Sequence, residues 1–219
     1  MKTLSPEALL LISLGIGIVP LMIAIGTCYL KFSIVLSLLR SGFGPQSAPT
    51  TSMVMALSMV MSLVVMQPVI SKTREVFADI PLAELSKGKV GEIVRQGESL
   101  MLPWRAFLTE HSGERELQTM SRLTHASDEK VGEDVGSKEP YIVAVLAAFV
   151  LSEIKKGFLI AFILLIPFFV IDLVVGNILV ALGLTMMSPS TVSLPLKLLL
   201  FVSSDGWLLL SKSLISAYR

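Results

Sequence analysis

Hydrophobic and polar positions divide the chain into two apolar blocks with a polar block between them. Residues 1–70 and 141–219 carry few charged side chains, whereas residues 71–140 are rich in both acids and bases. The first block contains two charge-free stretches, 8–30 and 53–70. Each is long enough as a helix to cross a hydrocarbon layer of roughly 30 Å. Together they predict an apolar helical hairpin over residues 1–70.

The segment between the two stretches carries local positive charge. Lys31 and Arg40 follow the first stretch without an acidic neighbour, so we expect them in a short connection, and residues 41–49 have the Gly, Pro and Ser content of a turn. Short basic connections tend to stay in the cytoplasm. The acidic insert, residues 71–140, is therefore expected on the other side of the membrane, with helical pieces such as 103–123.

The C-terminal block, residues 141–219, predicts broken helices. Charged residues within 153–156 interrupt its apolar run, and we expect neither flanking piece to form a clean span. Farther on, Gly183 and Pro189 break an uncharged stretch near its middle. The fold class predicted for the chain is all-α, with membrane-derived hairpins, broken helices and a small helical insert.

Composition points to the same class. Of the 219 residues, 53% are hydrophobic and only 16% charged, and the mean hydropathy is +0.77, far from the balance of a soluble domain. A net charge of +1 gives no indication of a nucleic-acid partner. The single cysteine, Cys28, excludes an intrachain disulfide.

The N-terminus has a second interpretation as a cleaved secretory signal. Lys2 precedes an apolar stretch, and residues 24–26 resemble a small-residue cleavage site. Glu7 in the expected basic region and Pro20 inside the apolar stretch argue against cleavage, so we expect a retained membrane segment.

No set of residues indicates catalysis, a cofactor or a metal. His111 and His125 are the only histidines and belong to no HExxH motif, and the chain lacks the GxxxxGK[ST] phosphate loop and the GxSxG nucleophile motif. We expect a protein that is not an enzyme.

Six charged residues lie inside the apolar C-terminal block, where each costs a few kcal/mol at the bilayer centre unless it is paired or hydrated. They form either structural pairs inside a protein assembly or an ion path. The absence of closely spaced carboxylates favours structural pairs, and on a helix the first and third of the six lie one turn apart. The six are Glu153, Lys155, Lys156, Asp172, Lys197 and Asp205.

Small residues and methionines supply two further features. Small residues at helical spacing predict faces where another helix approaches closely. Met186 and Met187 lie between two helix breakers, so these flexible apolar side chains either project from a loop, as at a pore constriction, or pack in a core. The small residues are Ala144, Ala148, Ser152, Gly157 and Ala161.

Longer runs resemble the FliP/SctR family of type III export apparatus proteins. They cover both apolar blocks in order and leave out only the insert. The runs are 31–40, 151–158, 166–174 and 193–202, followed by Asp205, Gly206 and Trp207.

The resemblance implies a core subunit of an export gate in the bacterial inner membrane, with the assembly largely on the periplasmic side. It implies a homo-oligomer, usually of five copies, that forms a helical pore with SctS-like and SctT-like subunits, beside SctU-like and SctV-like proteins. Unfolded proteins pass through this pore. The family's methionine gasket corresponds to Leu184, Thr185, Met186 and Met187, where most relatives have methionine at the first two positions.

Other positions also depart from the family pattern. Ala147 stands where relatives usually have proline, and Ala161 where they have glycine. Ser188, Pro189 and the ending 210–215 resemble the injectisome branch more than the flagellar one.

Two alternatives to a pore subunit remain. One is a small ion-coupled or proton-coupled transporter that uses Asp172, Lys197 and Asp205. The other is a scaffold without a pore of its own.

Overall fold

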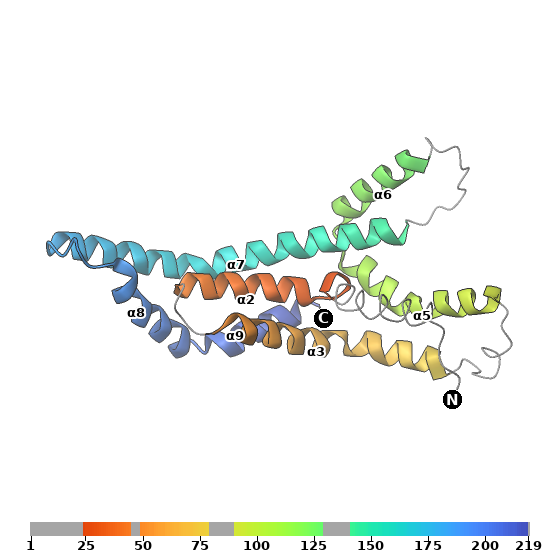
Figure 1. Cartoon of the computed structure of the whole chain (residues 1–219), viewed down its shortest axis with the longest axis horizontal. Coiled ribbons are helices and arrows are strands. Elements are labelled where there is room, and N and C mark those ends of the chain that lie inside the picture. Colours follow the sequence, from red (N-terminus) through yellow and green to blue (C-terminus); the bar gives the residue numbers. More distant parts are fainter. Residues whose placement is uncertain (1–23, 45–48, 79–89, 129–140, 219) are drawn as a thin grey trace, which may run out of the picture. The chain divides into compact units, whose positions relative to one another are not determined.

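The structure is a computed structural model that describes residues 24–44, 49–78, 90–128 and 141–218. Within these ranges every regular element is a helix, which confirms the predicted all-α class (Figure 1). Most of the stretch 8–30 lies outside the described residues. The helices are α2 (Tyr29–Phe43), α3 (Thr51–Ala78), α5 (Val90–His111), α6 (Glu114–Asp128), α7 (Ile142–Ala181), α8 (Pro189–Ser203) and α9 (Gly206–Ser216).

The chain forms two compact units, each with a core of its own. The first unit contains Met66–Glu153 and the described part of Met1–Tyr29, and the second contains Leu30–Val65 and Ile154–Arg219. The long helices α3 and α7 contribute residues to both units.

Aromatic side chains of α5 build the core of the first unit. The ring of Phe107 lies 5.8 Å from that of Phe149 in α7, measured between centroids. The indole N–H of Trp104 donates a hydrogen bond to the carbonyl oxygen of Gly26 at 2.7 Å. The helices α5 and α6 confirm that the polar insert contains helical pieces.

In the second unit, four aromatic residues join α2, α7, α8 and α9. Phe43 lies 4.8 Å from Phe168 and 5.4 Å from Phe201 between ring centroids, and Phe201 lies 5.1 Å from Trp207. These contacts bury the inner faces of short helices that have little intrinsic stability. They place the end of α2 beside α7 and α8.

The prediction that charges within 153–156 interrupt the helix was wrong. α7 is continuous over 40 residues. The charges do not break it because they lie on different faces: Glu153 is fully buried, whereas Lys155 and Lys156 are exposed. The helical period therefore separates one internal charge from two external ones.

Lys31 and Arg40 were also expected in a loop, and the structure places both in α2. Lys31 is buried, and its ammonium lies 3.8 Å from the ring centroid of Tyr218. Such a cation–π contact stabilises a cation that has left water. The turn between α2 and α3 accordingly begins only after Phe43.

Two helices in the described residues, Thr51–Ala78 and Ile142–Ala181, are long and apolar enough to cross a membrane. The first confirms the stretch 53–70 as a candidate span. The helices α8 and α9 meet at an angle of 61° and count as a third candidate if the bent pair is one span. This bend confirms that the C-terminal block contains broken helices.

Candidate functional site

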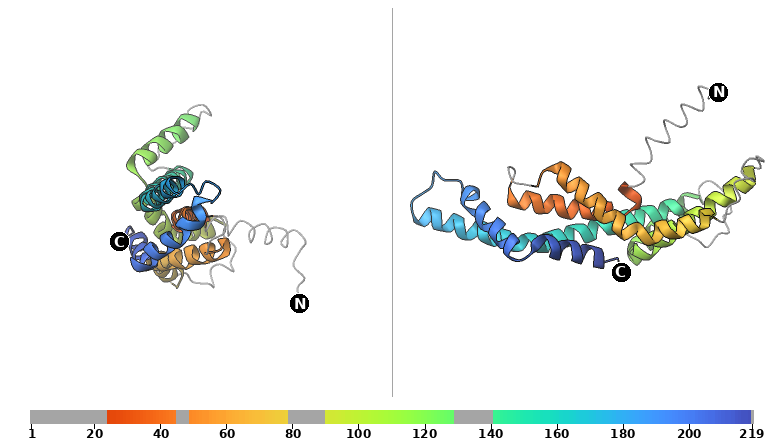
Figure 2. Two further views of the ribbon diagram at one scale, coloured as in Figure 1. Left: turned by 90° about the vertical axis from the view of Figure 1, so that its left-hand side faces the viewer. Right: turned by 90° about the horizontal axis from the view of Figure 1, so that it is seen from below.

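The candidate site is the turn of residues 182–188, where the chain leaves α7 and returns in α8 (Figure 2). α7 ends in a glycine cap. Gly183 has a φ of +74°, and its N–H donates to the carbonyl of Val180 at 3.0 Å while the N–H of Leu184 donates to the carbonyl of Leu179 at 2.9 Å. This pair of bonds is the Schellman arrangement, in which glycine takes the left-handed conformation at low cost.

Proline starts the next helix. Pro189 lies at the beginning of α8, where its fixed φ suits a helix and its missing N–H is not needed. Between the two breakers, the N–H of Met187 donates to the carbonyl of Leu184 at 3.2 Å and closes a four-residue turn. The break predicted at Gly183 and Pro189 is confirmed, and the turn has a defined conformation.

The apolar side chains of this turn project away from the core of their own chain. Met186 is 98% exposed, and Leu184, Thr185 and Met187 are exposed as well. A methionine that packed in a core would have most of its surface covered. Of the two interpretations of the methionines, the structure favours the projecting one.

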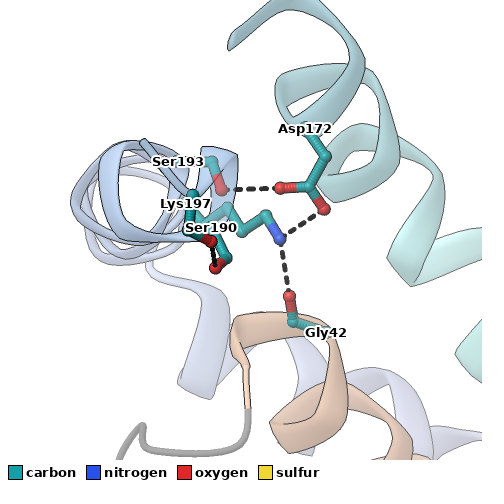
Figure 3. A network of polar contacts seen from close by, with 6 residues as sticks. Gly42, Asp172, Ser190, Ser193 and Lys197 are labelled. Atoms are coloured by element: carbon teal, nitrogen blue, oxygen red, sulfur yellow. Dashed lines mark hydrogen bonds and ion pairs between the residues drawn. The ribbon is translucent and has the colours of Figure 1, made fainter. Parts of the chain in front are cut away.

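A polar network joins the two helices that carry the turn (Figure 3). Nζ of Lys197 in α8 lies 2.6 Å from Oδ2 of Asp172 in α7. The hydroxyl of Ser193 donates a hydrogen bond to Oδ1 of the same carboxylate at 2.6 Å. The side chain of Lys197 is 6% exposed and that of Asp172 is 39% exposed. Two of the six charged residues thus form the kind of structural pair that the sequence suggested.

The ammonium of Lys197 also reaches a third helix. It donates a hydrogen bond to the carbonyl oxygen of Gly42 at 2.9 Å, in the last turn of α2. Carbonyl groups in a last turn lack intrahelical donors and lie at the negative end of the helix dipole. Lys197 therefore caps α2 while it pairs with Asp172.

The structure separates Asp205 from this cluster of roles. Asp205 occupies the turn between α8 and α9 with a φ of 52°, and its side chain is exposed. A left-handed conformation is tolerated by aspartate better than by most residues. Asp205 marks the bend between the two helices.

The small residues lie on buried faces of α7. Ala144, Ala148 and Ser152 are buried in the first unit, and Ala161 is buried in the second. A Cβ atom added to Gly157 would lie 3.4 Å from Cγ2 of Ile34 and 3.6 Å from Cα of Lys31. Within the chain, Gly157 thus faces the close approach of α2.

Sequence reasoning missed Ser193 and the carbonyl of Gly42. Ser193 lies four residues before Lys197, so the two share a helix face, and this spacing was an available signal. The carbonyl of Gly42 gives no sequence signal. Among the described residues, no group of three or more His, Cys, Asp or Glu could hold a metal ion.

Comparison with known proteins assigns the chain to a family. The model of the FliP family matches residues 10–214. The chain belongs to the FliP family. The match runs through both apolar blocks and the insert, so this FliP family chain is covered over nearly its whole length.

Individual relatives come from both flagellar and other secretion systems. The chain is 37% identical to surface presentation of antigens protein SpaP of Shigella flexneri, over 92% of this FliP family chain and 91% of the relative. It is 35% identical to Yop proteins translocation protein R of Yersinia pestis, over 92% and 91%. It is also 35% identical to flagellar biosynthetic protein FliP of Pectobacterium carotovorum subsp. carotovorum, over 99% and 80%.

Proposed function

We propose that this chain is a core subunit of a type III secretion export gate, part of the channel through which unfolded proteins cross the bacterial inner membrane. As a FliP family member it is an export-apparatus protein for protein transport. The single observation that carries the pore mechanism is the exposure of Met186, 98%, on a turn framed by Gly183 and Pro189.

The turn is proposed to act as a gasket. Copies arranged around an axis would bring Leu184, Met186 and Met187 of each chain to the narrowest point. Unbranched thioether side chains exclude water and ions yet change rotamer easily around a passing chain. Thr185 adds a hydroxyl where most relatives have methionine, so we propose a less apolar ring at that level.

The exposed apolar surface supports assembly. Along the second half of α7, large side chains such as Phe162, Leu173 and Val180 are more than half exposed. The 40 residues of α7 span about 60 Å, twice a hydrocarbon core of about 30 Å, so lipid alone is too thin to cover them. We propose that they are covered by further copies, probable in number five by family resemblance, and by SctS-like and SctT-like subunits, with SctU-like and SctV-like proteins adjoining.

The chain is proposed to act in the inner membrane, with the assembly largely on its periplasmic side. The candidate spans Thr51–Ala78 and Ile142–Ala181 support a membrane-embedded protein. We retain the division into an N-terminal hairpin (1–70), an extracytoplasmic insert (71–140) and a C-terminal block with the gasket turn (141–219). Because Lys31 and Arg40 belong to α2, their charge no longer supports the orientation as that of a loop would.

The ionic and small residues are proposed to serve the structure of the gate. The pairing of Asp172 with Lys197, and the burial of Glu153, support structural roles over an ion path. We propose that the chain has no catalytic activity and that other components supply the energy. Ser188 and Pro189 further support the injectisome branch, as the resemblance implied.

The state of the extracted protein tests this proposal. After mild detergent extraction, we expect a large ring on a native gel, and the complete assembly should conduct ions when substrate holds it open in a planar bilayer. A stable monomer that moves a solute into liposomes would instead establish the transporter. A ring that never conducts would establish the scaffold.

A further inference from the structure

We propose that Asp172, Ser193 and Lys197 are positioning residues for the gasket turn, because they fix the base of the α7–α8 hairpin against the end of α2. This inference rests on the proposed function, since it gives the position of the turn a role in sealing a pore. It goes beyond a stabilising ion pair in that it assigns the network a direction: it sets where Met186 lies.

The network lies at the base of the arm that carries the turn. Asp172 precedes the end of α7 at Ala181 by a little over two helical turns, and Ser193 and Lys197 occupy the corresponding part of α8. With a rise of about 1.5 Å per residue, this arm is about 14 Å long, so a tilt of about 10° at its base moves the tip about 2 Å. A gasket that excludes water tolerates little displacement of this size.

The third partner makes the network a mount for the hairpin. An ion pair between α7 and α8 alone would hold the two helices together but leave the hairpin free to tilt as a unit. The bond from Lys197 to the carbonyl of Gly42, 2.9 Å, joins the hairpin to α2. Nearby, Phe43 of α2 packs on Phe168 of α7 at 4.8 Å between ring centroids, so α2 is itself held in the unit.

Ser193 fixes the orientation of the carboxylate. Its hydroxyl occupies Oδ1 of Asp172 while the ammonium of Lys197 occupies Oδ2, so both oxygens are held. Hydrogen bonds to charged groups are shorter and stronger than those between neutral groups. Ser193 is itself buried, which removes competition from water at its hydroxyl.

Replacement of Ser193 tests the proposal without removal of the ion pair. In the assembled complex, Ser193→Ala should form rings in normal amount, while backbone hydrogen exchange over residues 182–197 becomes about tenfold faster. The resting ion conductance of the complex should rise. The matched control is Ser203→Ala, because the hydroxyl of Ser203 is exposed and bonds only to the carbonyl of Leu200 in its own helix.

A charge exchange tests the role of Gly42. Asp172→Lys combined with Lys197→Asp restores opposite charges on α7 and α8, but it places a carboxylate against the carbonyl of Gly42, where no bond forms. We expect fast exchange and high conductance in this double variant. Recovery of the wild-type exchange rate would show that a simple pair suffices and would overturn the mount.

The two readouts separate this inference from the proposed function. Unchanged exchange in Ser193→Ala, with or without a loss of assembled rings, shows that Ser193 is not a positioning residue. Faster exchange with unchanged conductance also overturns the inference if the Met186→Ala, Met187→Ala double variant does leak. If that double variant does not leak either, the gasket itself is wrong, while the effect on exchange still establishes that the network positions the turn.

Discussion

The hydroxyl of Ser152 accepts a hydrogen bond from the backbone N–H of Gly113 at 2.7 Å and donates one to the carbonyl of Ala148 at 2.7 Å. Gly113 precedes α6, and its own carbonyl accepts the N–H of Leu117 at 2.9 Å. The helix-packing face predicted for α7 thus includes a polar contact that fixes the start of a helix in the insert.

Ser152→Ala should destabilise the first unit by about 1–2 kcal/mol, because the N–H of Gly113 loses its acceptor in a partly buried place. The thermal unfolding midpoint of the purified complex measures this change. Thr119→Ala is the control, since the hydroxyl of Thr119 is exposed and bonds only within α6. Equal midpoints for the two variants would contradict the assigned role of Ser152.

Substitutions at Gly157 should have graded effects. Gly157→Ala places its methyl 3.4 Å from Ile34, an ordinary contact, so the complex should form in nearly normal amount. Gly157→Leu must displace α2 and should cost about 1–3 kcal/mol or more. Quantities of assembled ring on native gels measure the difference. If leucine is accepted as well as alanine, the close approach of α2 is not needed for assembly.

Lys197→Ala should impair assembly before it affects transport. Removal of the ammonium takes the partner from Asp172 and the cap from α2, and breaking a buried pair costs up to about 3–5 kcal/mol, here reduced by the partial exposure of Asp172. Lys212→Ala serves as the control, because Lys212 is exposed in α9. Normal rings that fail to export protein would assign Lys197 a direct role in transport.

The double variant Met186→Ala, Met187→Ala should leak ions. Alanine shortens two side chains in each copy and widens the proposed constriction, so the resting conductance of cells or of the purified gate should rise severalfold. Conservative replacement of the same residues by leucine should keep the leak low. Conductance equal to that of the wild type in the alanine variant would count against the gasket.

The sequence predicted the local features of this site well, because they depend on local chemistry. Gly183 and Pro189 end and start helices through their own backbone preferences, and Met186 projects between them. The partner of Lys197 was not predictable in this way. Asp172 lies 25 positions away and the carbonyl of Gly42 lies 155 positions away, so only the packing of three helices brings them together.

The errors in the N-terminal and C-terminal blocks share one physical cause. Charged residues within apolar sequence were treated as ends of helices, as at Lys31 and near Glu153. The structure buries both residues inside continuous helices. A charge disfavours lipid more than it disfavours a helix, and contact with protein, such as the ring of Tyr218 beside Lys31, takes the place of water.

Imaging the purified oligomer by electron microscopy tests the central claim most directly. The measurement is the position of Met186 and Met187 relative to the symmetry axis of the ring. The account predicts that the methionine turns of all copies meet at the narrowest point of a central conduit. Turns that face lipid or solvent at the outside of the ring would contradict it.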